Sequence, residues 1–205
     1  MRVIDSADAD AARAAAAAVR EGLLVVLPTD TVYGLGADPR SLRAVDRLLT
    51  AKGRGRDKPS PVLVASVAQA EELAREAPDV AKALMAEFWP GALTLVLPSE
   101  RLGWDLGETN GTIALRMPNH PAALELLKEA GPLAVSSANL SGRPPAATVG
   151  EAVEQLGGKV AVYLDGGSCP GGAPSTIVSF DGGLMRVLRE GGVGRGELAR
   201  FGDVA

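Results

Sequence analysis

The chain has 205 residues, 46% of them hydrophobic and 22% charged, with a formal net charge of −4 and a pI near 5.1. This balance is typical of a soluble globular protein, and the acidic charge argues against a surface that coats nucleic acid, although a local basic patch is compatible with it. The single cysteine, Cys169, excludes an internal disulfide and a cysteine-based zinc site. Because no apolar run reaches bilayer-spanning length and no signal-like leader begins the chain, we expect a cytoplasmic protein.

The first predicted elements are an alanine-rich helix and a buried strand. The helix is predicted over residues 6–21, with Ser6 as its N-cap and Gly22 after its end. Residues 23–27 form an unbroken apolar run rich in branched side chains, which predicts a strand buried on both faces.

The rest of the chain alternates in the same way. Asp38 and Pro39 offer an N-cap and first-turn proline for a helix that Gly53 ends, and capping boxes are predicted at Ser66 and Thr148. Further helices are predicted over residues 66–76, 78–89, 121–129 and 196–201, and after residue 148. Strands are predicted over residues 61–65, 92–97, 112–115, 133–135, 160–164, 176–180 and 184–188. This order predicts one α/β domain over residues 1–205 with a mixed parallel and antiparallel sheet.

Polar groups follow the first predicted strand abruptly. Thr29, Asp30 and Thr31 lie where that strand should end, with Gly34 and Gly36 just behind them. Hydroxyls at the end of a buried strand, followed by glycines that let backbone approach closely, suit a small polar ligand. An ordinary strand-to-helix turn, in which the threonines bond to nearby backbone, is the alternative.

Four cations lie close together in the stretch A-K-G-R-G-R-D-K-P. Lys52, Arg54, Arg56 and Lys58 are interrupted by two glycines, so this loop could fold over a polyphosphate. It matches no known phosphate-loop signature, and a solvated charged loop is the alternative.

Polar or basic side chains also lie at the ends of other predicted strands. They are Arg116, Ser136, Ser137, Asn139, Ser175, Thr176 and Arg189. Each has a structural alternative, such as a turn or a surface ion pair. Their agreement favours a ligand site, because strand ends of open α/β sheets line a common crevice.

Residues for nucleophilic or metal catalysis are not evident. The only histidine, His120, suits helix capping or packing, and Cys169 has no second histidine to activate it, which favours an inert thiol. No metal-ligand cluster is present in the sequence, so a divalent ion would arrive with a nucleotide. An enzyme with these residues would work by positioning and charge neutralisation.

Several motifs occur together in one order along the chain. They are P-T-D-T-V-Y-G-L-G, K-G-R-G-R-D-K-P, F-W-P-G-A-L-T-L-V-L, T-I-A-L-R-M-P-N-H-P, S-S-A-N-L-S-G, P-S-T-I-V and L-R-E-G. In this order, over about residues 9–194, the chain resembles the YrdC/Sua5 family of threonylcarbamoyl-AMP synthases in their short, single-domain form. The resemblance implies a twisted mixed sheet flanked by helices around a concave basic cavity.

The resemblance also implies an activity. The enzyme would be a nucleotidyltransferase that joins L-threonine, bicarbonate or CO2, and ATP into threonylcarbamoyl-AMP and releases diphosphate, with Mg2+ accompanying the ATP. Other proteins would then transfer the threonylcarbamoyl group to adenosine 37 of tRNAs that read codons beginning with A. We therefore expect small-molecule substrates, with tRNA and the transfer proteins as downstream partners, and no membrane.

Site residues are implied by the same resemblance. L-Threonine would be held by Thr31, Arg116, Ser137 and Ser175. ATP would contact Arg54, Lys58, Thr112, Asn139, Thr148 and Arg189. Lys52 and Arg54 would be the catalytic residues, with Lys52 facing the phosphates.

Carbamates decompose in open water, so we hypothesise that the loop 52–58 closes over the site as a lid. The chain departs from the family in three places, one of which is V-S-S-A-N at residues 135–139 in place of the pattern A-P-S-A-N. Gly55 stands where many members have proline, and Leu63 stands near a histidine that helps some members bind threonine. Two alternative functions are RNA binding through the same basic cavity, and the activity of a paralogue that uses another carbamoyl acceptor. The acidic charge and the lack of aromatic side chains near the basic loop weigh against RNA binding.

Overall fold

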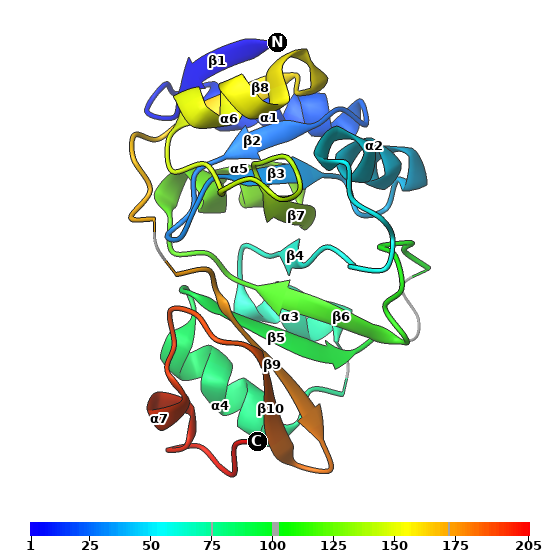
Figure 1. Ribbon diagram of the computed structural model, residues 1–205, viewed down its shortest axis with the longest axis vertical. Coiled ribbons are helices and arrows are strands. Elements are labelled where there is room, and N and C mark those ends of the chain that lie inside the picture. Colours follow the sequence, from blue (N-terminus) through cyan, green and yellow to red (C-terminus); the bar gives the residue numbers. More distant parts are fainter. Residues whose placement is uncertain (75, 100–102, 172) are drawn as a thin grey trace.

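A ten-stranded sheet forms the centre of the computed structural model, which describes residues 1–74, 76–99, 103–171 and 173–205. The strand order is β1-β8-β2-β3-β7-β4-β6-β5-β9-β10, with both parallel and antiparallel neighbours (Figure 1). The strands are β1 (Arg2–Asp5), β2 (Val25–Leu27), β3 (Gly34–Ala37), β4 (Val62–Leu63), β5 (Leu93–Pro98), β6 (Thr112–Arg116), β7 (Leu133–Ser137), β8 (Val162–Asp165), β9 (Thr176–Asp181) and β10 (Leu184–Arg189). The helices are α1 (Ala11–Arg20), α2 (Leu42–Lys52), α3 (Val67–Leu73), α4 (Asp79–Phe88), α5 (Pro121–Ala130), α6 (Val149–Leu156) and α7 (Arg195–Leu198), with a 3-10 turn, η1, at Gly157–Lys159. The predicted α/β class and mixed sheet are confirmed.

The apolar run at residues 23–27 contributes β2, whose residues are all buried, as predicted. An antiparallel partner, β3, follows it in a hairpin, which the sequence pattern does not predict because Gly34–Ala37 is rich in glycine. Packing requires glycine at position 34, since a Cβ there would lie 2.6 Å from Cγ1 of Val135 in β7. The hairpin turns through residues 28–33, which carry the predicted threonines.

The predicted start of the first helix is wrong. Residues 2–5 form the edge strand β1, and the backbone N–H of Ser6 donates to the carbonyl of Asp165 at 2.8 Å, which extends the pairing of β1 with β8. Ser6 therefore belongs to the end of a strand, and α1 begins only at Ala11.

The N-cap of α2 is Ser41 and not Asp38, because the Ser41 hydroxyl accepts a hydrogen bond from the backbone N–H of Ala44. Gly53 ends this helix in the left-handed conformation, with φ of 64°, as predicted. Ser66 and Thr148 are confirmed as N-caps of α3 and α6.

The remaining predicted elements are present with slightly different ends, and these differences bear on the site. Arg116, Ser137 and Arg189 are the last residues of β6, β7 and β10, and Ser175 immediately precedes β9. The strands thus carry the predicted ligand residues on their ends.

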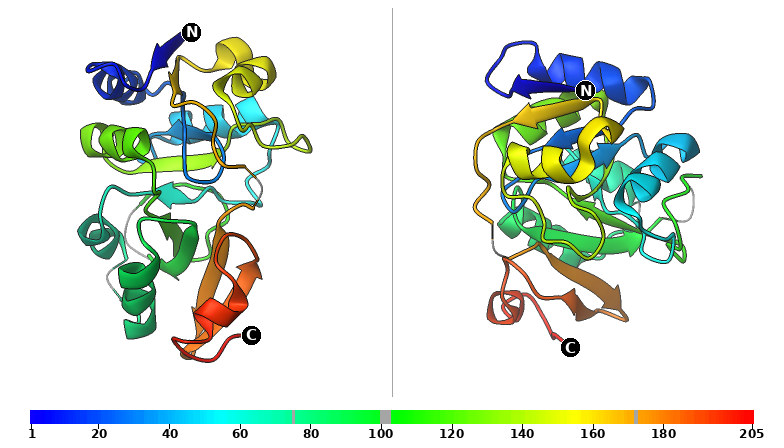
Figure 2. Two further views of the ribbon diagram at one scale, coloured as in Figure 1. Left: turned by 90° about the vertical axis from the view of Figure 1, so that its left-hand side faces the viewer. Right: turned by 45° about the horizontal axis from the view of Figure 1, so that its top comes forward.

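Helices cover both sides of the sheet. One apolar cluster joins α1 and α5 to β2, β7 and β8, and the two helices lie together on one side while α2 and α6 lie on the other (Figure 2). A larger cluster contains the buried apolar residues of α2, α3 and α4. No helix in the described part of the chain is long and apolar enough to cross a membrane.

Candidate active site

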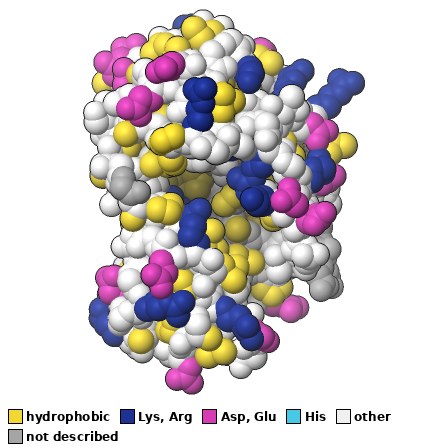
Figure 3. Space-filling model, in the orientation of Figure 1, with side chains coloured by type: hydrophobic (Ala, Val, Ile, Leu, Met, Phe, Trp, Pro, Cys, Tyr) yellow, Lys and Arg dark blue, Asp and Glu magenta, His cyan; other side chains and the backbone are white. Residues whose placement is uncertain are grey.

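A cavity of about 480 Å³ lies between the two ends of the sheet. Figure 3 shows the hollow across the middle of the molecule, with apolar side chains on its floor and Lys or Arg side chains beside it. The predicted residues that line it are Thr31, Arg54, Arg116, Ser137, Ser175 and Arg189. These residues come from segments far apart in the sequence, so the fold brings together all four residues of the predicted threonine site and two of the six predicted for ATP.

Neighbouring strands in register form the floor of this cavity. Leu63 of β4 is paired with Arg116 of β6, and Thr94 of β5 is paired with Ile177 of β9, which in turn faces Arg189 of β10. Side chains of directly paired residues point to the same side of a sheet. Leu63 therefore adds an apolar wall beside Arg116.

The loop 28–33 is folded around the hydroxyl of Thr29. This oxygen accepts hydrogen bonds from the backbone N–H groups of Thr31 (3.1 Å) and Val32 (3.3 Å), and its hydrogen is donated to the carbonyl of Val32 at 2.6 Å. The hydroxyls of Thr29 and Thr31 lie 3.0 Å apart. Thr29 and Thr31 are both buried, so the loop is fixed by contacts that exclude water.

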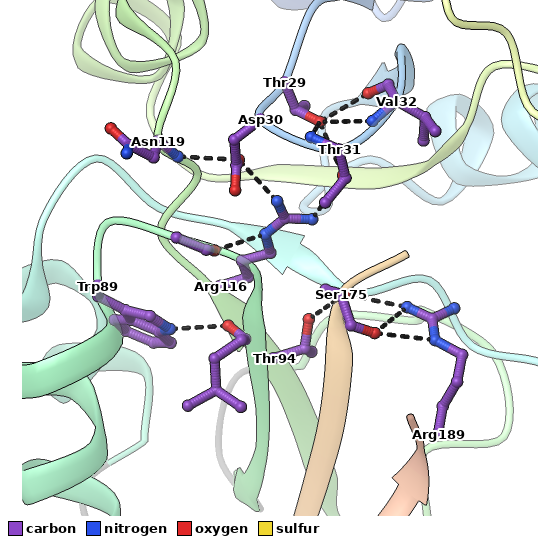
Figure 4. A network of polar contacts seen from close by, with 12 residues as sticks. Thr29, Asp30, Thr31, Val32, Trp89, Thr94, Arg116, Asn119, Ser175 and Arg189 are labelled. Atoms are coloured by element: carbon purple, nitrogen blue, oxygen red, sulfur yellow. Dashed lines mark hydrogen bonds and ion pairs between the residues drawn. The ribbon is translucent and has the colours of Figure 1, made fainter. Parts of the chain in front are cut away.

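Arg116 projects from the end of β6 toward this loop (Figure 4). Its Nε donates to the carbonyl of Gly91 (2.9 Å), its Nη1 to Oγ1 of Thr31 (3.2 Å) and its Nη2 to Oδ1 of Asp30 (2.6 Å). Asp30 also accepts from the backbone N–H of Asn119 at 2.9 Å. A guanidinium has five N–H donors, so each terminal nitrogen of Arg116 keeps one for a ligand carboxylate.

The charge of Arg116 is shielded from water. Burial lowers the pKa of its guanidinium, and the adjacent carboxylate of Asp30 acts in the opposite direction. A buried, rigid cation with free donors is a strong site for an anion, because little water competes with the ligand.

A second arginine, Arg189, is held by Ser175 on the other side of the cavity. Its Nε and Nη2 donate to the carbonyl of Ser175 at 3.0 and 2.8 Å, and Nη2 also donates to the Ser175 hydroxyl at 3.0 Å. That hydroxyl lies 2.8 Å from the hydroxyl of Thr94 (Figure 4). The pKa of Arg189 is lowered by burial and then by the positive charges of Arg116 and Arg54.

Arg54 is the third arginine of the cavity. Its Nη1 donates to Oγ of Ser136 at 3.1 Å, whereas its buried Nε has no partner in the described part of the chain. Burial also lowers its pKa. Among the described residues, Asp30 is the one carboxylate ion-paired to any of Arg54, Arg116 and Arg189, so the cavity suits ligands that carry more than one negative charge.

Other predicted site residues lie outside the cavity lining. They are Lys52, Lys58, Thr112, Asn139 and Thr148. Lys58 is exposed in the basic loop. Thr112 is at the opposite end of β6 from Arg116 and donates to the carbonyl of Thr109 (2.7 Å). Thr148 accepts from the backbone N–H of Glu151 as the cap of α6.

Lys52 does not face the cavity, contrary to the sequence-based expectation. It is 3% exposed, and its Nζ donates to the carbonyls of Ser137 and Asn139 and to Oδ1 of Asn139. Burial, and then the charge of Arg54, lower the pKa of Lys52 to about 8. The sequence motif places Lys52 at the end of a helix, but it does not show whether the side chain points to the cavity or to the segment that contains Asn139.

The structure adds Thr94, which the sequence analysis did not assign to the site, because its hydroxyl contacts that of Ser175. Asp30 and Ser136, which the sequence places at strand ends without a stated role, contact Arg116 and Arg54. Thr94 lies in an apolar strand, and only its pairing with Ile177 brings it to the cavity.

The basic loop is tied to its surroundings through Arg56. This side chain forms ion pairs with Asp46 of α2 (2.5 Å) and with Asp105, and its carbonyl accepts from the backbone N–H of Glu108 at 2.9 Å. Arg56 is therefore occupied with protein carboxylates, and the free cations of this loop are Arg54 and Lys58 as far as the described residues extend.

The predicted packing role of His120 agrees with its surroundings, since it precedes α5 without a capping side-chain bond and a Cβ on Gly166 would lie 3.0 Å from its ring. Cys169 is buried, and burial raises its pKa, which suits an inert thiol. The described residues contain no group of three or more His, Cys, Asp or Glu that could hold a metal ion.

The fold and cavity define an α/β protein with a three-arginine anion site at converging strand ends. The chain belongs to the Sua5/YciO/YrdC family: the family model, described as "Telomere recombination", matches residues 17–191.

Individual relatives agree with this membership. A Mycobacterium tuberculosis relative is 54% identical over 186 residues, covering 90% of this chain and 86% of the relative. The threonylcarbamoyl-AMP synthase of Bacillus subtilis is 43% identical over 90% of this chain and 54% of its own length. The crystal structure of P. abyssi Sua5 complexed with L-threonine has a TM-score of 0.89 and 39% identity, and covers 95% of this chain and 58% of that chain. The chain thus spans little more than half of these longer relatives.

Proposed function

We propose that the protein is an L-threonylcarbamoyladenylate synthase, a nucleotidyltransferase that makes threonylcarbamoyl-AMP and diphosphate from L-threonine, bicarbonate or CO2, and ATP. The name of the B. subtilis relative denotes this activity, and the Sua5 relative was crystallised with L-threonine. The observation that carries the proposal is the buried guanidinium of Arg116, which keeps free N–H donors between the loop 28–33 and two further arginines.

Threonine would bind on the Arg116 side. Its carboxylate would take the two free N–H donors of Arg116, and its amine or hydroxyl would donate to the remaining lone pair of Thr31. Ser137 and Ser175, which line the same cavity, would supply further small hydroxyls. The apolar Leu63 beside Arg116 would contact the threonine methyl group in place of a polar contact.

ATP would bind across Arg54 and Arg189, with Lys58 added from the exposed loop. Asn139, Thr112 and Thr148 stay predictions for nucleotide contact, since none lines the cavity. Mg2+ would arrive with the triphosphate and neutralise part of its charge.

The chemistry follows from these charges. The neutral amine of threonine attacks CO2 and forms a carbamate, with loss of one proton. A carbamate oxygen then attacks the α-phosphorus of ATP, the bond from that phosphorus to the bridging oxygen breaks, and diphosphate leaves. The first step creates a new anion and the second brings it against the triphosphate, so three arginines in a shielded cavity lower the barrier by neutralising charge and fixing orientation.

In the cell, the product would supply the threonylcarbamoyl group of N6-threonylcarbamoyladenosine at position 37 of tRNAs that read codons beginning with A. Separate transfer proteins would act on tRNA, because threonylcarbamoyl-AMP is a mixed anhydride and already activated for transfer to an amine. A cytoplasmic location stays a prediction from the sequence.

The direct test is a diphosphate-release assay with labelled bicarbonate, in which each substrate is omitted in turn. We expect release and label incorporation into an adenylate only when threonine, bicarbonate and ATP are all present. Release independent of threonine would contradict the proposal and favour a different carbamoyl acceptor. Binding of a tRNA transcript without binding of threonine or ATP would favour the RNA-binding alternative.

A further inference from the structure

Lys52 is a buried lysine whose partners are all neutral. It is the last residue of α2 and is 3% exposed, although lysine is rarely buried without a carboxylate. Its acceptors are the Ser137 and Asn139 carbonyls and the Asn139 amide oxygen, and the latter two lie 2.8 and 3.2 Å from Nζ. These bonds use all three hydrogens of the ammonium group, so none is left for a phosphate.

The backbone of Lys52 contacts the same segment a second time. Its carbonyl accepts a hydrogen bond from the backbone N–H of Ser141 at 2.8 Å. Side chain and backbone of one residue therefore hold residues 137–141 near both ends. Asn139 completes the turn, because its Nδ2 donates to the carbonyl of Arg143 at 2.8 Å.

This segment directly continues the wall of the cavity. Ser136 and Ser137 are the last residues of β7 and both line the cavity, and Ser136 also accepts from Arg54. Without an anchor for the segment that follows it, the end of β7 would sample other positions, because residues that form a site keep their geometry only where surrounding contacts hold them.

We propose that Lys52 is a positioning residue that fixes residues 137–141 and thereby holds the end of β7, with the Ser136 hydroxyl that accepts from Arg54, in place beside the cavity, and that it does not contact phosphate. Its effect on substrate rests on the proposed function, in which Ser137 contacts threonine. A lysine that contacted phosphate would instead affect ATP alone.

The first test needs no ligand. Amide hydrogen exchange of residues 137–141 is compared between the wild type and Lys52→Met, which keeps the apolar stem and removes the ammonium group. We expect these amides to exchange about tenfold faster or more in the variant. The matched control is Lys159→Met, because Lys159 donates to the carbonyl of Ala51, one residue before Lys52, and does not contact the segment. Unchanged exchange in Lys52→Met would overturn the proposal, whether or not the protein makes threonylcarbamoyl-AMP.

The second test is a pair of calorimetric titrations, one with threonine in the absence of ATP and one with ATP in the absence of threonine. We expect Lys52→Met to bind threonine about tenfold more weakly and Lys159→Met to bind it like the wild type. Normal threonine binding combined with weaker ATP binding would assign Lys52 to the phosphates and overturn the proposal. Failure of the wild type to bind threonine would instead contradict the proposed function. The hydrogen-exchange result alone would then decide whether Lys52 fixes residues 137–141. If Lys52→Met does not fold, Lys52→Gln, which keeps an amide donor, is measured in the same way.

Discussion

Two loops border the cavity, and the protein holds them in opposite ways. The loop 28–33 is largely buried and is fixed by the Thr29 hydroxyl, by Arg116 and by the Asp30 carboxylate. The loop that follows Gly53 is largely exposed, and its main tie, Arg56, pairs with carboxylates that are each 54% exposed. Buried contacts are strong and unscreened, whereas exposed ion pairs contribute little and are weakened by salt.

Because of this difference, substitutions in the two loops should affect folding stability and turnover differently. Substitutions around the loop 28–33 should change threonine binding and folding together, because the same hydrogen bonds serve both. Substitutions in the basic loop should change turnover while leaving folding nearly intact. The amino-acid side of the site is thus prepared before the ligand arrives, and the nucleotide side depends on the charges it presents to ATP.

The largest effect is expected from Arg116→Ala. We expect threonine binding to weaken about a hundredfold or more and the free energy of unfolding to fall by about 3–5 kcal/mol, because the Asp30 carboxylate, only 15% exposed, loses its ion-pair partner. Calorimetric titration and urea denaturation measure the two effects. The double variant with Asp30→Ala should regain part of the stability but none of the binding. Wild-type affinity in Arg116→Ala would remove the basis of the threonine site.

Arg54→Ala should show most clearly that the basic loop affects turnover and not stability. We expect diphosphate release to fall about a hundredfold, as for loss of a transition-state donor, with less than about 1 kcal/mol change in the free energy of unfolding. Steady-state kinetics and denaturation are measured on the same preparation. Arg43→Ala, an exposed arginine of α2, is the control and should be active. Unchanged turnover in Arg54→Ala would exclude this loop from the reaction.

Thr29→Val tests the buried loop with a nearly isosteric change. The backbone N–H groups of Thr31 and Val32 would lose their acceptor, so we expect about 1–3 kcal/mol lower unfolding free energy and about tenfold weaker threonine binding. Thr29→Ser keeps the hydroxyl and should restore most of both quantities. If Thr29→Val alters neither, the loop is not organised by this hydroxyl.

The buried Lys52 predicts a pH dependence of stability. Its pKa is lowered in the folded state to about 8 from an ordinary value of 10.5, so the unfolded chain binds more protons between these pH values. The free energy of unfolding of the wild type should therefore rise relative to Lys52→Met as pH increases from about 8 to about 10.5. Denaturant titrations across this window measure the difference, and a difference that falls with pH would contradict the direction of the shift.

The smallest effect is expected from Arg56→Gln. Because its ion pairs are exposed, the loss should be less than about 1 kcal/mol of stability and about twofold in turnover. Both differences should vanish at high salt. Arg40→Gln removes another surface pair, with Asp38, and is the control for a general charge effect. A large, salt-independent loss would show that the basic loop is held more tightly than its exposure indicates.

Much of this molecule could be predicted from its sequence, for physical reasons that also explain the errors. The apolar run of β2 and the hydroxyl caps at Ser66 and Thr148 act locally, so their patterns were sufficient. The strand β3 was missed because Gly34 is selected by a neighbour, Val135, and not by local preference. Likewise, the motifs predict which residues line the cavity. They do not predict that Lys52 points toward Asn139, because this direction depends on tertiary contacts.

The central claim is that threonine and ATP occupy the two sides of one cavity. It is tested most directly by a crystal structure with L-threonine and a non-hydrolysable ATP analogue. We predict the threonine carboxylate on the terminal nitrogens of Arg116 and the triphosphate between Arg54 and Arg189. Threonine bound elsewhere, or a nucleotide that leaves Arg54 and Arg189 without an anionic partner, would contradict the account.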